Sequence, residues 1–346
     1  MQSAVDWLES LSPWPEDGFG TERMLRLLAR LGNPERTFDA VHVVGTKGKS
    51  TATRRIARTI GGPAYTSPHV AGWHERLDTD PDGFEAAVAR IRPEAEAVGA
   101  TQFEAVTAAA FTDFSERGAA VAAIEAGLGG RHDATNVIDA RVVLLTNVGL
   151  EHTDVLGATR EAIAREKLAV ASPHSIVVLP DDELTGFVPE GAEVRFGGAE
   201  EAVEAFLGWR VPLADAELPG RLEVRGSEVR DGAHTPEAVE WLLERLPEPH
   251  DYVVVASILR DKDAAGILDR LARAGTTLVA TESTNPRALA AEAVAELART
   301  RFAAVHTIRD PAAAVAFARD QGGRLLVTGS LYLLADLADD DRKSVR

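Results

Sequence analysis

Short apolar runs alternate with longer amphipathic stretches along this chain, and the alternation predicts strands separated by helices. In the first half, apolar runs that predict strands lie at Ala40–Val44, Ala119–Ile124 and Val142–Leu145. Helical spacing of apolar residues follows at Ser50–Ile60, Phe84–Val98, Thr101–Arg117 and about Thr159–Ala171. In the second half, strands are predicted at Val253–Ser257, Thr277–Thr281, Ala303–Thr307 and Arg324–Thr328, with helices between them. Strands that alternate with helices favour parallel sheets covered on both faces.

The pattern predicts two doubly wound α/β domains, of which the first is the larger. A length of 346 residues fits about two domains of ~150 residues each. The stretch Ser172–Leu218 is rich in proline and glycine and less regular, so we expect a linker or domain edge there, with domains at 1–218 and 219–346. The opening helix is expected to follow Thr21 as its cap and to end at Gly32 and Pro34.

Composition narrows the class of protein. Hydrophobic residues make up 45% of the chain and charged residues 26%, which is typical of a soluble globular protein. No apolar run of membrane-spanning length occurs, the acidic stretch Met1–Gly18 does not resemble a signal peptide, and there is no cysteine. We therefore expect a cytoplasmic protein that does not bind a membrane and uses no thiol chemistry.

The net charge of −17, from 37 basic and 54 acidic residues, disfavours a nucleic-acid partner. Any anionic ligand must be held by a local binding site.

Such a binding site is predicted where the first strand passes into a helix. The loop consists of Gly45, Thr46, Lys47, Gly48, Lys49, Ser50 and Thr51. Glycines let backbone N–H groups approach phosphate, Lys49 can reach terminal phosphate oxygens, and the hydroxyl of Ser50 can be a ligand for Mg²⁺. The loop is the short Gly-x-x-Gly-Lys-Ser form, since Val43 stands where the longer pattern has its first glycine. The alternative is an ordinary strand-to-helix turn with exposed lysines.

Several strings along the chain resemble the successive motifs of the folylpolyglutamate/dihydrofolate synthases, a family of the Mur ligase superfamily. In order, the strings lie at Val41–Thr51, Tyr65–Leu77, Ile124–Asn136, Thr146–Lys167, Leu218–Val224, Asp231–Pro236, Asp261–Asp263 and Val327–Leu334. They run through nearly the whole chain. The longest, including Glu-Ala-Gly-Leu-Gly-Gly-Arg, are too specific to arise by chance.

The resemblance implies an enzyme that uses ATP to phosphorylate a carboxylate and then joins L-glutamate to it as an amide. The implied substrates are ATP, L-glutamate and a dihydropteroate or folate carboxylate, and the implied cofactors are ATP and Mg²⁺. Two anions must meet in such a reaction, so cations have to neutralise the developing charge. Family members are commonly monomers, and we expect the same here.

The resemblance places Mg²⁺ on Ser67, Glu125 and His152, in addition to Ser50. Glu125 also stands out by itself, because it ends a buried strand at the carboxyl edge where ligands gather in parallel sheets. The alternative for Glu125 is a turn cap, and for His152 a hydrogen-bonding loop residue. Glu151 stands where family members usually carry Asp.

Lys167 shares the face of its helix that is expected to be buried with Ile163 and Val170. In the family the matching lysine is carbamylated and helps to hold a second Mg²⁺. Burial would favour the neutral amine that attacks CO₂. The alternative is an ion pair with Glu166 or Asp154.

In the second domain the resemblance assigns ATP contacts to Arg221 and Asp231 and a place near the terminal phosphate to His234, in a site formed between domains. Phe103 and Glu104 match positions that line the pterin pocket. The alternatives are surface charge for Arg221, a tight turn at Asp231 and core packing for Phe103.

The chain departs from the family at several points. The phosphate loop has Ser50 where a glycine is usual, Thr235 replaces an asparagine, and the chain is shortened after Leu77 and within 172–218. Two other hypotheses remain: a Mur-type ligase with a different carboxylate acceptor, and a nucleotide-binding pseudoenzyme.

Overall fold

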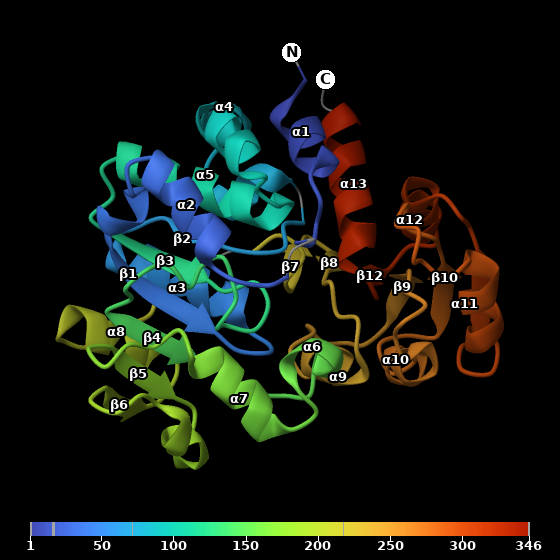
Figure 1. Cartoon of the computed structure of the whole chain (residues 1–346). Helices are drawn as coiled ribbons and strands as arrows, with labels where there is room; N and C mark the ends of the chain where they lie inside the picture. Colours follow the sequence, from blue (N-terminus) through green and yellow to red (C-terminus); the bar gives the residue numbers. More distant parts are fainter. Residues whose placement is uncertain (1, 16–17, 71, 217, 345–346) are drawn as a thin grey trace. The chain divides into compact units, whose positions relative to one another are not determined.

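The computed structural model describes residues 2–15, 18–70, 72–216 and 218–344, and it forms two compact units. The first unit comprises residues 1–69 and 73–216, and the second comprises 70–72 and 217–346. Each unit is built around its own six-stranded sheet with helices on both faces (Figure 1). The predicted fold class is confirmed.

The sheet of the first unit is entirely parallel, in the order β2-β3-β1-β4-β5-β6. Its strands are β1 (Asp39–Val44), β2 (Ala64–Tyr65), β3 (Val121–Glu125), β4 (Val142–Leu145), β5 (Ile176–Leu179) and β6 (Glu193–Phe196). Its helices are α1 (Ala4–Ser10), α2 (Glu22–Arg30), α3 (Lys49–Ile60), α4 (Pro81–Val98), α5 (Gln102–Glu116), α6 (Thr153–Leu156), α7 (Arg160–Leu168) and α8 (Ala199–Leu207). Short 3₁₀ helices lie at Pro34–Arg36, Trp73–Leu77 and Asp182–Phe187.

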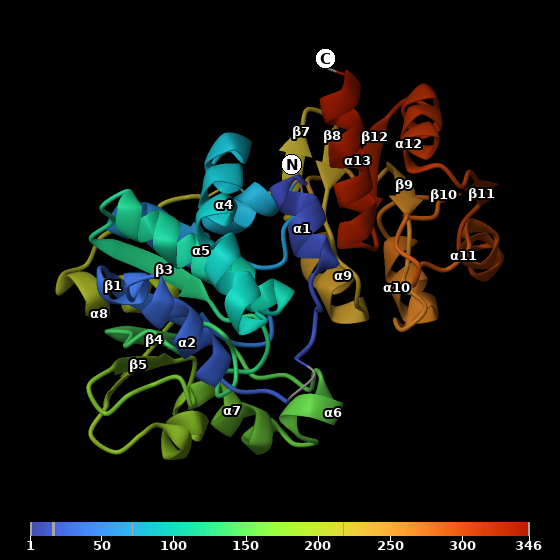
Figure 2. The ribbon, with the colours of Figure 1, turned by 45° about the horizontal axis from the view of Figure 1, so that its top comes forward.

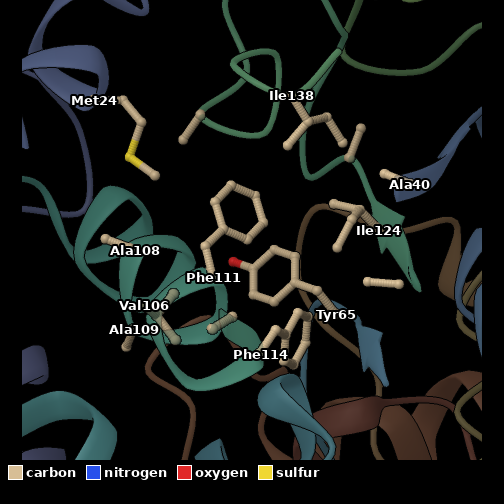
Figure 3. Close-up of a cluster of buried hydrophobic side chains, with 14 of the residues drawn as sticks. Met24, Ala40, Tyr65, Val106, Ala108, Ala109, Phe111, Phe114, Ile124 and Ile138 are labelled. Carbon is tan, nitrogen blue, oxygen red and sulfur yellow. The ribbon is translucent and has the colours of Figure 1, made fainter. Parts of the chain in front are cut away.

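Alternate side chains of β1 pack into two different cores, as the period of a strand requires. Ala40 and Val44 face the core made with α1, α2, α4 and α5, whereas Val41 and Val43 face α3 and α8. Figures 1 and 2 show α4 and α5 side by side over the first of these faces. Tyr65, Phe111 and Phe114 converge in that core (Figure 3). The sheet is thus held rigidly on both sides, which fixes the loops at its carboxyl edge.

The second unit has the sheet order β11-β10-β9-β12-β8-β7, parallel except for the edge strand β7. Its strands are β7 (Glu223–Arg225), β8 (Glu228–Arg230), β9 (Tyr252–Ala256), β10 (Thr277–Ala280), β11 (Ala304–Thr307) and β12 (Arg324–Thr328). Its helices are α9 (Pro236–Leu243), α10 (Ala264–Leu271), α11 (Ala291–Ala298), α12 (Pro311–Asp320) and α13 (Leu331–Ser344). Helices α9, α10 and α11 cover one face, and α12 and α13 cover the other.

Three local predictions need correction. The stretch 172–218 was predicted as a linker or a domain edge; it is not a linker, because β5, β6 and α8 lie within it and β5 and β6 complete the first sheet, and the first compact unit ends within it at residue 216. The helix after Thr21 is the second helix, since α1 precedes it. Thr21 itself has a helical backbone and makes no capping hydrogen bond with its side chain.

None of the helices in the described parts of the chain combines the length and apolar character needed to cross a membrane.

Candidate active site

The predicted phosphate loop joins β1 to α3, so the strand–loop–helix unit is present. Gly45 has φ 147°, and a Cβ added there would lie 2.0 Å from Thr146 Oγ1. Gly48 precedes the helix with φ 79° and leaves the N-terminus of α3 without a side-chain cap. A helix N-terminus carries unpaired N–H groups and a partial positive charge, which suit a phosphate.

Glu125 is buried, with 1% of its surface exposed, and joins two other predicted residues. Its Oε1 accepts a hydrogen bond from Ser50 Oγ at 2.9 Å, and its Oε2 accepts one from the backbone N–H of Ser67 at 3.0 Å. Glu125 ends β3, Ser67 follows β2, and Ser50 lies in the first turn of α3 after β1; these three strands adjoin in the parallel sheet. The structure therefore brings Ser50, Ser67 and Glu125 together at one edge.

This oxygen-rich cluster fits a magnesium–nucleotide complex. Mg²⁺ takes hard oxygen ligands and usually keeps only one or two protein groups beside phosphate oxygens and water. Glu125 and the Ser50 hydroxyl are such donors. Among the described residues no three His, Asp or Glu side chains converge as a ready-made metal cage. The donor set thus suits a cation that arrives with its nucleotide.

His152, unlike the buried Glu125, is an exposed residue. It directly precedes α6 with φ 50°, a left-handed conformation that is uncommon outside glycine. Its side chain is 56% exposed, and its Nε2 lies 3.8 Å from Glu151 Oε1. Its part in metal binding stays a prediction.

Lys167 is buried on α7 beside Ile163, on the face that the spacing predicted. Its Nζ donates a hydrogen bond to the carbonyl of Gly45 at 2.8 Å, so it contacts the phosphate loop directly. Burial, reinforced by the positive charge of Lys49, lowers the pKa of Lys167 to about 8. Glu166, one of the two carboxylates considered as its partner, lies 3.3 Å from Arg131.

The glycine run before Arg131 explains how Lys167 reaches this position. A Cβ at Gly130 would lie 2.6 Å from the carbonyl oxygens of both Glu166 and Lys167. The backbone N–H of Arg131 donates to the carbonyl of Glu166 at 3.0 Å. The loop after β3 therefore packs directly on the backbone of α7, and glycine is the residue that permits this approach.

A buried polar network that the sequence reasoning missed supports the same loop. Asp133 accepts hydrogen bonds from the N–H groups of Leu128 and Thr135 and from Thr135 Oγ1. His42 Nε2 lies 2.8 Å from Thr135 Oγ1, which links the loop to β1. Burial raises the pKa of Asp133 and lowers that of His42 to about 3. The one signal in the sequence was a histidine inside an otherwise apolar strand.

Asn147 was also missed, although it lies inside a quoted motif. Its backbone carbonyl accepts from Thr46 N at 3.1 Å, and its side-chain Oδ1 accepts from Lys47 N at 2.9 Å. Two N–H groups of the phosphate loop are thus bonded to protein.

The geometry gives Glu104 a structural task. With Thr101 it forms a capping box at the start of α5, and its Oε2 lies 2.7 Å from Arg23 Nε. The ring of Phe103 lies against Gly127, where a Cβ would come within 2.5 Å of it. Phe103 and Glu104 therefore lie where packing and capping account for their contacts, and their role in a pocket stays a prediction.

In the second unit, Asp231 follows β8 and is buried. Its carboxylate accepts hydrogen bonds from the N–H groups of Leu222 at 2.7 Å and Ala233 at 2.8 Å. Burial raises its pKa, against the opposing effects of these hydrogen bonds and of the Arg221 charge. His234 Nδ1 lies 2.8 Å from the carbonyl of Gly232, so Nδ1 carries the proton in this contact. Their roles toward ATP stay predictions.

The fold is that of a Mur ligase. Residues 43–204 match the Mur ligase middle domain, and residues 220–331 match the glutamate ligase domain of the Mur ligases. The chain is 30% identical to a folylpolyglutamate synthase of Lacticaseibacillus casei, with 90% of this chain and 92% of that protein covered. It therefore belongs to the folylpolyglutamate/dihydrofolate synthase family.

Solved structures agree with this assignment. E. coli FolC in complex with DHPP and ADP superimposes with a TM-score of 0.85 at 26% identity, covering 99% of both chains. The bifunctional folylpolyglutamate synthase/dihydrofolate synthase of Yersinia pestis, complexed with AMPPNP and a Mn ion, gives a TM-score of 0.81 at 26% identity and 98% coverage of both chains.

Proposed function

We propose that this chain is an ATP-dependent ligase that joins L-glutamate to the carboxylate of a dihydropteroate or a folate. The observation that carries the proposal is a set of hydrogen bonds. Glu125 accepts from Ser50 and Ser67, and Lys167 donates to the phosphate loop beside them. Relatives of the same fold were solved with DHPP and ADP, and with Mn, AMPPNP and L-glutamate. A different acceptor and a pseudoenzyme are the less favoured hypotheses.

The phosphate loop would bind ATP. The N-terminus of α3 supplies N–H groups and partial positive charge, and Lys49 adds a full charge at the terminal phosphate. Ser50, Ser67 and Glu125 would hold Mg²⁺, with His152 as a further ligand. Mg²⁺ when bound neutralises charge on the phosphates, so that a second anion can approach.

The reaction has two steps. An oxygen of the acceptor carboxylate attacks the γ-phosphorus of ATP, and ADP leaves with the electrons of the broken P–O bond. The neutral amino group of glutamate then attacks the acyl carbon, the C–O bond to the phosphate breaks, and the amine loses a proton. The products are an amide, ADP and a phosphate that carries one oxygen from the acceptor.

Lys167 would serve this site as a carbamate. The ammonium group first loses one proton to become a neutral amine; the amine then attacks the carbon of CO₂, a C–N bond forms and a second proton is released, so that a cation becomes an anion overall. The lowered pKa of Lys167 supports this, because a larger share of the amine is neutral near pH 7 than for an exposed lysine. The positive charge of Lys49 contributes to the lowered pKa of Lys167, and carbamylation would place a negative charge near Lys49.

Arg221, Asp231 and His234 would contribute to ATP binding from the second domain, and Phe103 and Glu104 to the pterin pocket. We further propose domain limits at 218 and 219, a monomeric state and a cytoplasmic location, without a nucleic-acid partner. The residue roles and the monomeric state rest on the resemblance, and the domain limits, the location and the lack of a nucleic-acid partner rest on the sequence pattern, composition and net charge.

The test is phosphate release by the purified full chain with MgATP and L-glutamate, with dihydropteroate and tetrahydrofolate in separate arms. We expect release that requires glutamate and at least one of the two pterins, and a loss of that release in Lys167→Ala and Glu125→Gln. Phosphate release that neither pterin increases would overturn the folate assignment and favour a Mur-type ligase with another acceptor.

A further inference from the structure

A set of hydrogen bonds ties the phosphate loop to the segment that leaves β4. Asn147 Oδ1 accepts from Lys47 N, and Asn147 Nδ2 donates to Lys47 O, both at 2.9 Å. Thr146 Oγ1 donates to the same carbonyl at 2.7 Å, and Gly149 N donates to Thr46 Oγ1 at 3.0 Å. With the bond from Thr46 N to the carbonyl of Asn147, these contacts form what we call the Asn147 clamp.

The clamp requires an amide at position 147. One planar group must accept from the N–H and donate to the C=O of the same residue, and among the side chains only Asn and Gln carry an acceptor and a donor in that arrangement. A carboxylate of the same shape would accept but could not donate. The clamp satisfies the N–H groups of Thr46 and Lys47, and the N–H groups in the first turn of α3, which have no acceptor within the helix, suit a phosphate.

The clamped segment also leads to the predicted metal ligand. Five residues after Asn147 the chain reaches His152, whose left-handed backbone turns the chain into α6. On the other side of the clamp the loop continues to Ser50, which donates to Glu125. A shift of the loop relative to this segment would therefore change the separation between Ser50 and His152.

We propose that Asn147 is a positioning residue that couples nucleotide binding to divalent-cation binding. The clamp holds the phosphate loop against the segment that carries His152. A nucleotide bound to the loop therefore also orders the Mg²⁺ ligands, and Mg²⁺ bound to its ligands also orders the loop. This inference rests on the proposed function, in that residues 45–51 are taken to bind the nucleotide and His152 to bind the metal. The side-chain amide of Asn147 is bonded to the backbone of Lys47, so its proposed role is to position the loop.

A merely structural contact would lower stability and leave this coupling unchanged. The distinguishing quantity is the ratio of the ADP dissociation constants measured without and with Mg²⁺. Linkage requires that the same ratio describe the effect of ADP on Mg²⁺ binding. The readout therefore needs no turnover.

The experiment measures ADP binding by calorimetry, with and without Mg²⁺, on the full chain of the wild type, Asn147→Ala and a control. The control is Thr59→Val, which removes two hydrogen bonds from the opposite end of α3, one to Arg55 O and one from Ala214 N. We expect the Mg²⁺ ratio to fall about tenfold in Asn147→Ala, since two hydrogen bonds are lost, and to keep its wild-type value in Thr59→Val.

An unchanged ratio in Asn147→Ala would overturn the inference while the proposed function stands. Failure of the wild type to bind ADP at all would overturn both. If Asn147→Ala does not fold, Thr146→Val removes one clamp bond to Lys47 O and should lower the ratio by a smaller factor, about threefold. A wild-type ratio in that variant would refute the coupling equally.

Discussion

The close packing of Gly130 on α7 makes the substitution Gly130→Ala a sharp test of how Lys167 is positioned. The added Cβ would lie 2.6 Å from the carbonyl oxygens of Glu166 and Lys167 and 2.9 Å from the Cα of Lys167. All three atoms are backbone, so no side-chain rotation relieves the clash. An ordinary contact of about 3.4 Å requires a relative shift of about 0.8 Å between the loop and the helix.

The magnitude of the effect follows from this shift. Overpacking of a well-packed site costs about 1–3 kcal/mol. A displacement of about 1 Å at a reacting centre lowers rates by about 10²-fold. We therefore expect Gly130→Ala to unfold at a lower denaturant concentration and to lose about 10–100-fold in kcat/KM for glutamate ligation.

The matched control is Gly186→Ala, because a Cβ at Gly186 would meet nothing within 4 Å. Urea unfolding and acceptor-dependent phosphate release are measured for both variants and the wild type. Gly186→Ala should behave as the wild type does. Wild-type stability and activity in Gly130→Ala would refute the argument that the glycine run sets the position of Lys167.

Three further predictions concern buried polar groups. Thr135→Val removes a donor from the buried carboxylate of Asp133 and should cost about 1–3 kcal/mol in urea unfolding; an unchanged midpoint would contradict the network. Glu104→Gln should lower stability through the loss of the Arg23 ion pair and, if Glu104 lines the pterin pocket as proposed, raise the KM for the pterin; destabilisation with an unchanged KM would contradict the pocket role and leave Glu104 its capping role alone. Lys167→Met should stabilise the protein more at about pH 7 than at about pH 10 in bicarbonate-free buffer. The pKa of Lys167 falls from 10.5 to about 8 on folding, so the cost of burying its charge is full below pH 8 and fades as the pH rises toward 10.5. If the difference in unfolding free energy between Lys167→Met and the wild type is the same at both pH values, the lowered pKa of Lys167 is contradicted.

Most strands with continuous apolar runs were predicted from the sequence, but β5 (Ile176–Leu179) is such a run and was missed, because its stretch was taken as a linker or domain edge. Runs such as Val142–Leu145 and Arg324–Thr328 match β4 and β12 residue for residue. β2 has only two residues, too few for any period to show. β6 is an edge strand whose side chains are partly or wholly exposed. It therefore has no apolar run by which it could be recognised within its proline- and glycine-rich stretch.

The candidate site divides in the same way, according to the reach of each interaction. The loop 45–51 and the buried face of α7 are local patterns, and both were found. Asn147 could not be found, because the partners of its side chain lie 100 residues away in the sequence. The capping role of Glu104 was predictable but was not predicted, although Thr101 and Glu104 stand at the spacing of a capping box; its role in a pocket stays a prediction.

The central claim is that the acceptor carboxylate is activated as an acyl phosphate, and oxygen transfer tests it most directly. The acceptor is supplied with its carboxylate labelled with ¹⁸O, together with MgATP and L-glutamate, and the released phosphate is analysed by mass spectrometry. The account predicts that one labelled oxygen appears in the phosphate for each amide formed. Amide formation with unlabelled phosphate would contradict the acyl-phosphate route.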